Sequence, residues 1–199
     1  MSINGQVSPA GELRTRLINS VEWAGWGWKL RNLPNILCGW RVAAAMLLRI
    51  PTIYGTLRIR TFGADGRVVD YGLVGCRVVT TAFVNFVVDQ LQTETSVFGD
   101  FLYHDSGVGT TAADVGDTDI ETTDAESRAS GSQTEGASAN IYKSVGTIAY
   151  TSTLAITEHG LFNASTGVTL MDRTVFSVIN VEDGSSIEFS YELTLTAGS

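Results

Sequence analysis

Cysteine, proline and histidine are scarce in this sequence, and it has no long hydrophobic run. Its 199 residues include two cysteines, three prolines and two histidines. Cys38 and Cys76 lack the close spacing of metal ligands, so they predict two buried thiols, with a disulfide as the alternative. The longest apolar run, Val42–Leu48, falls far short of the roughly 20 residues that cross a bilayer. Because the N-terminus is also too polar for a signal peptide, we expect a soluble chain made in a cytoplasm.

Charge is divided unevenly along the chain, whose net charge is −8. The residues up to Arg77 hold ten bases and four acids, a net charge of +6, and the remainder holds three bases and 17 acids, a net charge of −14. The bases lie singly among apolar residues, and an acidic body disfavours nucleic acid as a partner. The pattern therefore favours contact with another protein.

The first fifty residues are rich in tryptophan and arginine. Ser8-Pro9 is typical of a helix start, and the apolar spacing of the residues after it, up to Val21, predicts a short amphipathic helix. One interpretation of the four tryptophans that follow is a small core. Glycine-spaced segments build cores poorly, so we favour an extended, partly helical arm over residues 1–52 that docks on a neighbouring subunit. The residues predicted to bind that partner are Trp23, Trp26, Trp28, Arg31, Trp40 and Arg41.

Residues 53–199 are predicted to form a β body. Alternation over residues 53–62, turn residues at 63–66 and a second apolar stretch to Val78 predict a β-hairpin. A helix packed against the sheet is predicted over residues 80–92. The strictest alternation runs from Ile187 to Leu195 and predicts a strand with one buried face. The fold class is therefore mainly β, an antiparallel, jelly-roll-like β-sandwich.

Two motifs in the body resemble catalytic or cofactor sites. Residues 107–112 fit G-x-G-x-x-A, but no helix pattern follows to meet a pyrophosphate, so no cofactor is predicted. His104-Asp105-Ser106 has the composition of a triad, yet neighbours in a strand point to opposite faces and cannot form a relay. His159 follows Glu158 in a predicted turn between two strands. We expect both histidines to be polar members of the sheet, and no catalytic residue.

The sequence from 105 to 139 has no regular period and predicts a long acidic loop. Its carboxylates suit the oxygen chemistry of Ca²⁺, but they do not match the spacing of an EF-hand, so a solvated loop is the favoured interpretation. The weak calcium candidates are Asp114, Asp117, Asp119 and Glu121.

Several segments between Tyr103 and Leu195 resemble a module of tailed-bacteriophage virion proteins. They are residues 104–111, 134–139, 155–163 and 169–176, together with the strand that ends at Leu195. The resemblance implies a non-enzymatic β-sandwich of the phage head, tail or fibre, with no catalytic residues to carry over.

These observations together predict a capsid cement or decoration protein that binds between major capsid subunits and stabilises the head. We expect a homo-oligomer, with a trimer favoured at local three-fold positions, and neither membrane nor nucleic acid as a partner. The alternatives are a tail, collar, baseplate or fibre-attachment subunit, and a receptor- or glycan-binding domain. In the glycan-binding alternative Tyr103, Trp23 or Trp28 stacks on a sugar.

Overall fold

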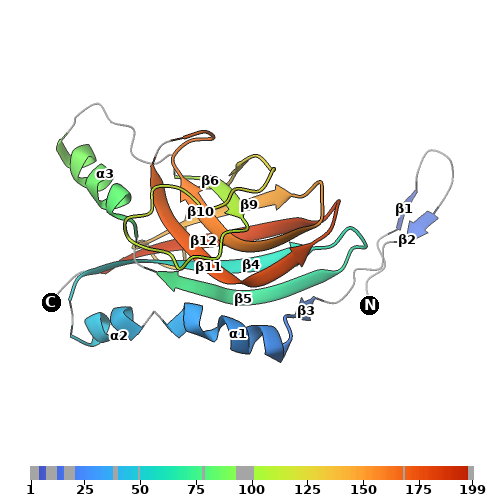
Figure 1. The fold of residues 1–199 in the computed structure, drawn as a ribbon, viewed down its shortest axis with the longest axis horizontal. Helices are drawn as coiled ribbons and strands as arrows, with labels where there is room; N and C mark the ends of the chain where they lie inside the picture. The colour runs from blue at the N-terminus through green and yellow to red at the C-terminus, as the bar shows by residue number, and fades with distance from the viewer. Residues whose placement is uncertain are drawn as a thin grey trace.

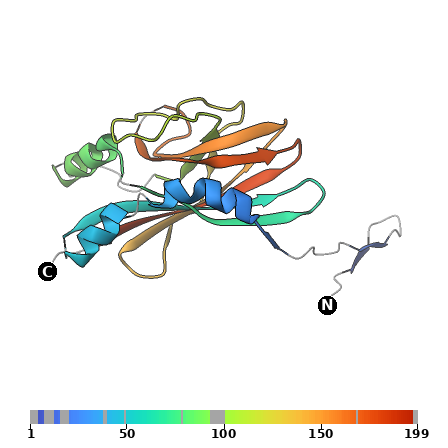
Figure 2. The ribbon, with the colours of Figure 1, turned by 60° about the horizontal axis from the view of Figure 1, so that its bottom comes forward.

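The computed structural model describes residues 5–7, 13–15, 21–37, 40–48, 50–77, 79–92, 101–167 and 169–196, and all structural statements concern these residues. Two sheets pack face to face to form a sandwich, and helices lie along its sides (Figures 1 and 2). The mainly-β sandwich predicted from the sequence is therefore confirmed. A separate small sheet pairs β1 (Gly5–Val7) with β2 (Leu13–Thr15).

The larger sheet has six strands in the order β3-β5-β4-β12-β9-β8, and the smaller has four in the order β11-β10-β6-β7. All pairings within them are antiparallel except that of β3 with β5. The six strands are β3 (Glu22–Trp23), β5 (Val68–Arg77), β4 (Thr52–Phe62), β12 (Ser186–Thr196), β9 (Ile141–Ala149) and β8 (Thr134–Glu135). The four are β11 (Leu170–Val181), β10 (Leu154–Phe162), β6 (Tyr103–Gly107) and β7 (Ala129–Ser130).

The last strand, β12, runs between β4 and β9 and supplies much of the core. Its alternation places Ile187, Phe189, Tyr191 and Leu193 in the interior, as predicted, and only Leu195, near the strand end, is exposed. Opposite them the smaller sheet contributes buried apolar residues of β10 and β11. The β4–β5 hairpin is confirmed as well, with Gly66 at a φ of 83° in its turn, a conformation that glycine adopts without strain.

Helix α3 (Thr81–Gln92) confirms the helix predicted over residues 80–92. The Thr80 hydroxyl accepts a hydrogen bond from the Phe83 N–H and so caps the helix. Phe83 is buried, with its ring edge-on to Phe101. Phe86 and Val87 pack on the same core, whereas the apolar residues on the other side of the helix, Val84, Val88 and Leu91, are exposed.

The smaller sheet is covered on its outer face by the loop that joins β6 to β7. Ile120 from this loop packs on Phe162 and Leu170 in a second, small core. Much of the β10–β11 pair is consequently buried on both faces. The predicted irregular segment 105–139 is thus shorter than expected, since its ends belong to β6, β7 and β8.

Two local predictions are wrong. Residues 13–15 form strand β2 rather than part of a helix, because they pair with β1, while residues 16–20 lie outside the described residues. Glu158-His159-Gly160 is not a turn, because β10 is one continuous strand through these residues and pairs there with both β6 and β11. Cys76 is buried in β5, and Cys38 lies outside the described residues.

The predicted arm is not extended from Val21 onward. Helix α1 (Trp26–Leu37) lies along the side of the sandwich where the edge strand β11 and strand β5 meet, and α2 (Trp40–Leu47) follows it beside β4 (Figures 1 and 2). The physical reason is that α1 satisfies backbone groups that these strands would otherwise leave unpaired.

Candidate functional site

Helix α1 has one face built for its own sandwich. The Trp28 indole N–H lies 3.1 Å from the Ser177 carbonyl oxygen and 3.0 Å from that of Val178, both in β11. One turn later, the Asn32 amide donates to the Val74 carbonyl of β5 at 2.8 Å and accepts from the Ser177 N–H at 2.8 Å. Asn32 is fully buried. This inward face bridges both sheets and fixes the helix in place.

The opposite face of α1 is apolar and turned to solvent. Trp26, Leu30 and Leu33 follow the i, i+4, i+7 spacing of one helical stripe, and Trp26 is 81% exposed. In α2 and the residue after it, Trp40 is 66% exposed, Leu47 85% and Leu48 68%. We call these six residues, Trp26, Leu30, Leu33, Trp40, Leu47 and Leu48, the α1–α2 face.

Exposed apolar side chains gather in this part of the chain. Ten of the sixteen large hydrophobic residues that are exposed among those described lie between Val21 and Ile53. The six side chains of the α1–α2 face together expose on the order of 800 Å² of apolar surface, if a whole tryptophan side chain presents about 250 Å² and a leucine less. One partner in a standard protein–protein interface buries about 800 Å². Exposed apolar patches of this size mark interaction sites on soluble proteins.

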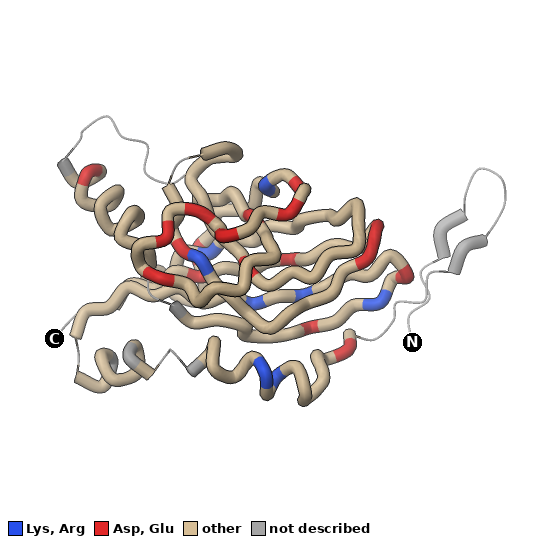
Figure 3. The backbone as a smooth tube through the Cα atoms, in the orientation of Figure 1, with Lys and Arg blue, Asp and Glu red and all other residues tan. Residues whose placement is uncertain are grey.

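The same region is basic. No acid occurs between Trp23 and Ala64, whereas six bases do. The Lys29 ammonium lies 5.3 Å from the centre of the Trp23 ring and 5.8 Å from that of Trp26, and Arg31 is exposed on the same helix. Figure 3 shows these bases on α1 and acidic residues along the loop over the smaller sheet. A partner for the α1–α2 face is therefore expected to present apolar and acidic groups.

The structure separates the six residues predicted to bind a partner. Trp23, Trp26, Arg31 and Trp40 are exposed, whereas Trp28 points into the protein's own core. Arg41 lies in α2, and its side chain is outside the described part of the chain. Leu30, Leu33, Leu47 and Leu48 are exposed too and were not among the predicted residues, although the helical spacing of the first two with Trp26 was a usable signal.

The acidic loop is fastened to the sheet below it. Arg173, in β11, is almost fully buried and lies 2.7 Å from Glu158, 3.0 Å from Asp117 and 3.3 Å from Glu121. Burial alone would lower the pKa of Arg173, but hydrogen bonds with Glu158 and Asp117 outweigh it and raise the pKa. The buried Glu158 carboxylate also accepts N–H groups of Gly109, Glu121 and Thr122.

A second arginine ties down the rest of the loop. Arg128 donates to Asp105 at 2.8 Å, reaches Asp119 at 3.4 Å and lies over the Phe162 ring. Three of the four calcium candidates thus face a guanidinium, and Asp114 accepts the N–H of Gly116. Within the described residues no group of three or more His, Cys, Asp or Glu side chains could hold a metal ion.

His104, Asp105 and Ser106 have separate partners, as the strand argument predicted. The His104 ring bonds Ser144 at 2.8 Å through Nε2 and His159 at 2.9 Å through Nδ1. Asp105 binds Arg128, and the Ser106 hydroxyl donates to Asp124 and lies 3.0 Å from the Tyr150 hydroxyl. Both histidines are fully buried members of the sheet.

Comparisons with known proteins give no relative. No protein-family model, curated protein or solved structure matches the chain. In the described part of the chain, no helix has the length and apolar character needed to cross a membrane.

Proposed function

We propose that this chain is a non-enzymatic structural subunit of a tailed-phage particle, a cement protein that binds the major capsid protein and stabilises the head. The observation that carries the proposal is the α1–α2 face, a basic and apolar surface on an acidic β-sandwich, with α1 fixed to both sheets by Trp28 and Asn32. The resemblance of residues 103–195 to phage virion modules supplies the setting.

The partner surface follows from the chemistry of the face. Its indoles and leucines call for apolar pockets, and Lys29 and Arg31 call for carboxylates around them. The exterior of a capsid shell that is acidic and shared by several subunits meets both needs. Because Trp28 and Asn32 already hold α1 in place, little free energy is lost in ordering the helix when it docks.

A pair of double variants tests the docking surface. Trp26→Ser/Leu30→Ser removes two exposed side chains of the α1–α2 face, and Val88→Ser/Leu91→Ser removes two exposed side chains of α3 as a matched control. Co-sedimentation with heads stripped of the protein is expected to show binding weakened by at least about tenfold for the first pair, because buried tryptophan anchors dominate interfaces. The α3 pair is expected to bind like the wild type.

Both pairs change exposed residues, so thermal unfolding is expected to confirm that each still folds. Equal binding by the two double variants would contradict docking through α1–α2. Two other outcomes would reassign the face, provided that Trp26→Ser/Leu30→Ser still binds heads. If this variant loses dimerisation of the isolated protein, the face binds a second copy. If it loses binding to anionic lipid vesicles, the face binds a membrane.

A further inference from the structure

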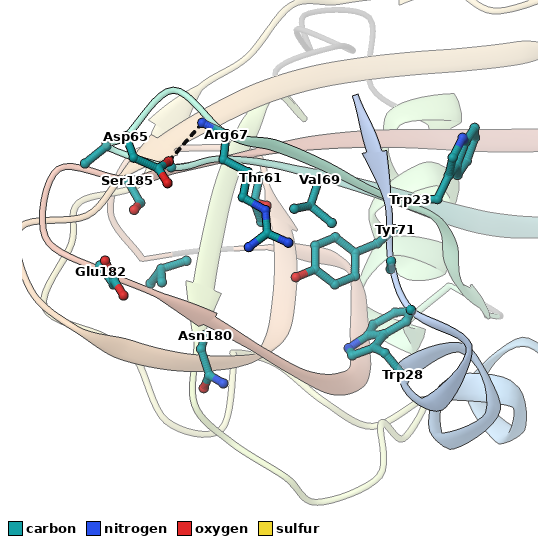
Figure 4. Close-up of a pocket in the computed structure, with 15 residues that line it drawn as sticks. Trp23, Trp28, Thr61, Asp65, Arg67, Val69, Tyr71, Asn180, Glu182 and Ser185 are labelled. Carbon is teal, nitrogen blue, oxygen red and sulfur yellow. Dashed lines mark hydrogen bonds between the residues drawn. The ribbon is translucent and has the colours of Figure 1, made fainter. Parts of the chain in front are cut away.

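An open cleft of about 390 Å³ lies at one end of the sandwich, outside the α1–α2 face. One wall is the tip of the β4–β5 hairpin, the other is the end of β11 with the turn after it, and the start of α1 closes the end (Figure 4). The volume is at the lower end of the roughly 300–1,000 Å³ typical of small-molecule sites.

Polar groups from separate elements converge on this space. Figure 4 shows the Arg67 guanidinium directed into it, while Asn180 stands at its edge on β11 and Glu182 in the turn that follows. Neither the Asn180 side chain nor the Glu182 side chain has a hydrogen bond or ion pair with another described residue. Asp65 uses one carboxylate oxygen on the Arg67 N–H at 2.9 Å and leaves the other available. The amide, carboxylate and guanidinium groups are planar, and each presents two neighbouring hydrogen-bonding atoms.

An aromatic wall completes the cleft. The half-buried Tyr71 ring packs edge-on against Trp28, with ring centres 4.8 Å apart, and so is held rigid. Its hydroxyl is turned toward Arg67 in Figure 4. Trp23 stands at the rim, 67% exposed. Tyr103, the other aromatic residue expected to stack on a sugar, packs on the far cluster around Phe162 and does not contribute.

The charge of the cleft selects among ligands. Arg67 is already neutralised by Glu22, at 2.6 Å, and Asp65 and Glu182 add two negative charges. A phosphate or an acidic sugar would be repelled. A neutral polyol suits the site, because vicinal hydroxyl groups pair with planar carboxylate and amide groups and the sugar's C–H face packs on an aromatic ring.

We propose that this cleft binds a neutral glycan of one to three sugar residues, with Asn180, Glu182 and Asp65 pairing with its hydroxyl groups and Tyr71 packing against a ring. The proposal stands independently of head docking, since none of these residues belongs to the α1–α2 face. On a virion surface such a site would give weak, multivalent contact with cell-surface polysaccharide.

Calorimetric titration and ligand-detected NMR with lactose, maltotriose, cellotriose and triacetylchitotriose test it, each at up to about 10 mM. At least one is expected to bind with a Kd on the order of 1 mM, as is usual for few-contact ligands. Asn180→Ala and Glu182→Gln are each expected to weaken that binding by about fivefold or more. Asp183→Asn, the same kind of change one residue outside the cleft, is expected to leave it unchanged.

Sialyllactose is expected to bind more weakly than lactose because its carboxylate meets Asp65 and Glu182. No binding by any of the four neutral glycans would overturn the proposal. Binding that is indifferent to Asn180→Ala and Glu182→Gln, or equally lost in Asp183→Asn, would overturn it as well. All three substitutions lie at exposed positions, so a folding defect is not expected to obscure the result.

Discussion

The two histidines of the chain lie together in the core, His104 on β6 and His159 on β10. The His159 ring stacks on Phe189, with ring centres 4.5 Å apart. Gly131 and Gly146 lie against the His104 ring, and a β-carbon at either glycine would come within 2.7 Å of it. These glycines are therefore needed for close approach rather than for a turn.

Burial sets how these histidines respond to pH. It lowers the pKa of His104 to about 4, and burial together with the neighbouring His104 lowers the pKa of His159 well below 6.5. The unfolded chain takes up these protons as the pH falls below 6.5, and the folded protein does not. Their contribution to stability is thus complete above pH 6.5 and declines by about 1.4 kcal/mol per pH unit for each histidine as the pH falls toward 4.

NMR of the imidazole protons in untagged protein measures this directly, because the chain has two histidines. Both are expected to stay neutral from pH 7 down to about 5, while the free energy of unfolding falls. The carboxyls of the buried Asp105 and the half-buried Asp124, whose pKa values are raised by loss of contact with water, act in the opposite direction at lower pH. An imidazole that titrates near pH 6.5 in the folded protein would show that the pair is not buried as described.

Single residues were the hardest to place from the sequence. Glu158-His159-Gly160 has the composition of a turn, and only the pairing of β10 on both sides shows that it is mid-strand. The ion pair of Glu158 with Arg173 was equally hidden, because the acids of the loop look solvated until a buried arginine below them is known. Side-chain partners distant in sequence leave no periodic signal.

Among the elements, α1 matters most because one of its faces packs on the sandwich and the other is exposed to solvent. Its inward face closes the sandwich between β5 and β11, and its outward face carries Trp26, Leu30 and Leu33. An experiment that deletes residues 1–40 would therefore expose the edges of two strands as well as remove part of the proposed docking surface. The contacts of α1 with β5 and β11 argue that the body does not stay folded after this deletion.

Asn32→Ala tests the structural role of α1. It leaves the buried Val74 carbonyl and Ser177 N–H without partners, so a loss of about 2–4 kcal/mol in the free energy of unfolding is expected. Arg31→Ala, at the next position but exposed, is expected to change it by less than about 0.5 kcal/mol. Denaturant unfolding compares the two. A similar small effect for both variants would mean that α1 is a detachable arm.

The periodic helices and strands were predicted well, but the parts of the protein against which they pack were not. The β4–β5 hairpin, α3 and β12 follow from alternation, turn residues and helical spacing. Helical spacing around Trp28 could not say which side of α1 faces inward, because both sides carry large apolar residues. The deciding contacts, from Trp28 and Asn32 to β11, join parts of the chain about 150 residues apart.

For the whole molecule, the bases of α1 lie on a different side of the sandwich from the acidic loop, while Arg60 and Arg67 pair with acids on or beside the larger sheet. The basic and apolar α1–α2 face lies along one side of the sandwich, and the acidic loop covers the outer face of the smaller sheet (Figure 3). Such a molecule has a defined orientation on an acidic partner. Its sandwich core and its two buried arginine networks serve stability, and the α1–α2 face is the surface that we propose for attachment.

If the chain is a structural subunit of the phage head, as we propose, it must be present in many copies in each particle, and that number can be measured. Quantitative mass spectrometry of purified particles from the virus that encodes it would give the ratio of this chain to the major capsid protein. A cement protein is expected at hundreds of copies per particle. Tens or fewer would assign the chain to the tail or collar, and absence from purified particles would contradict a virion role altogether.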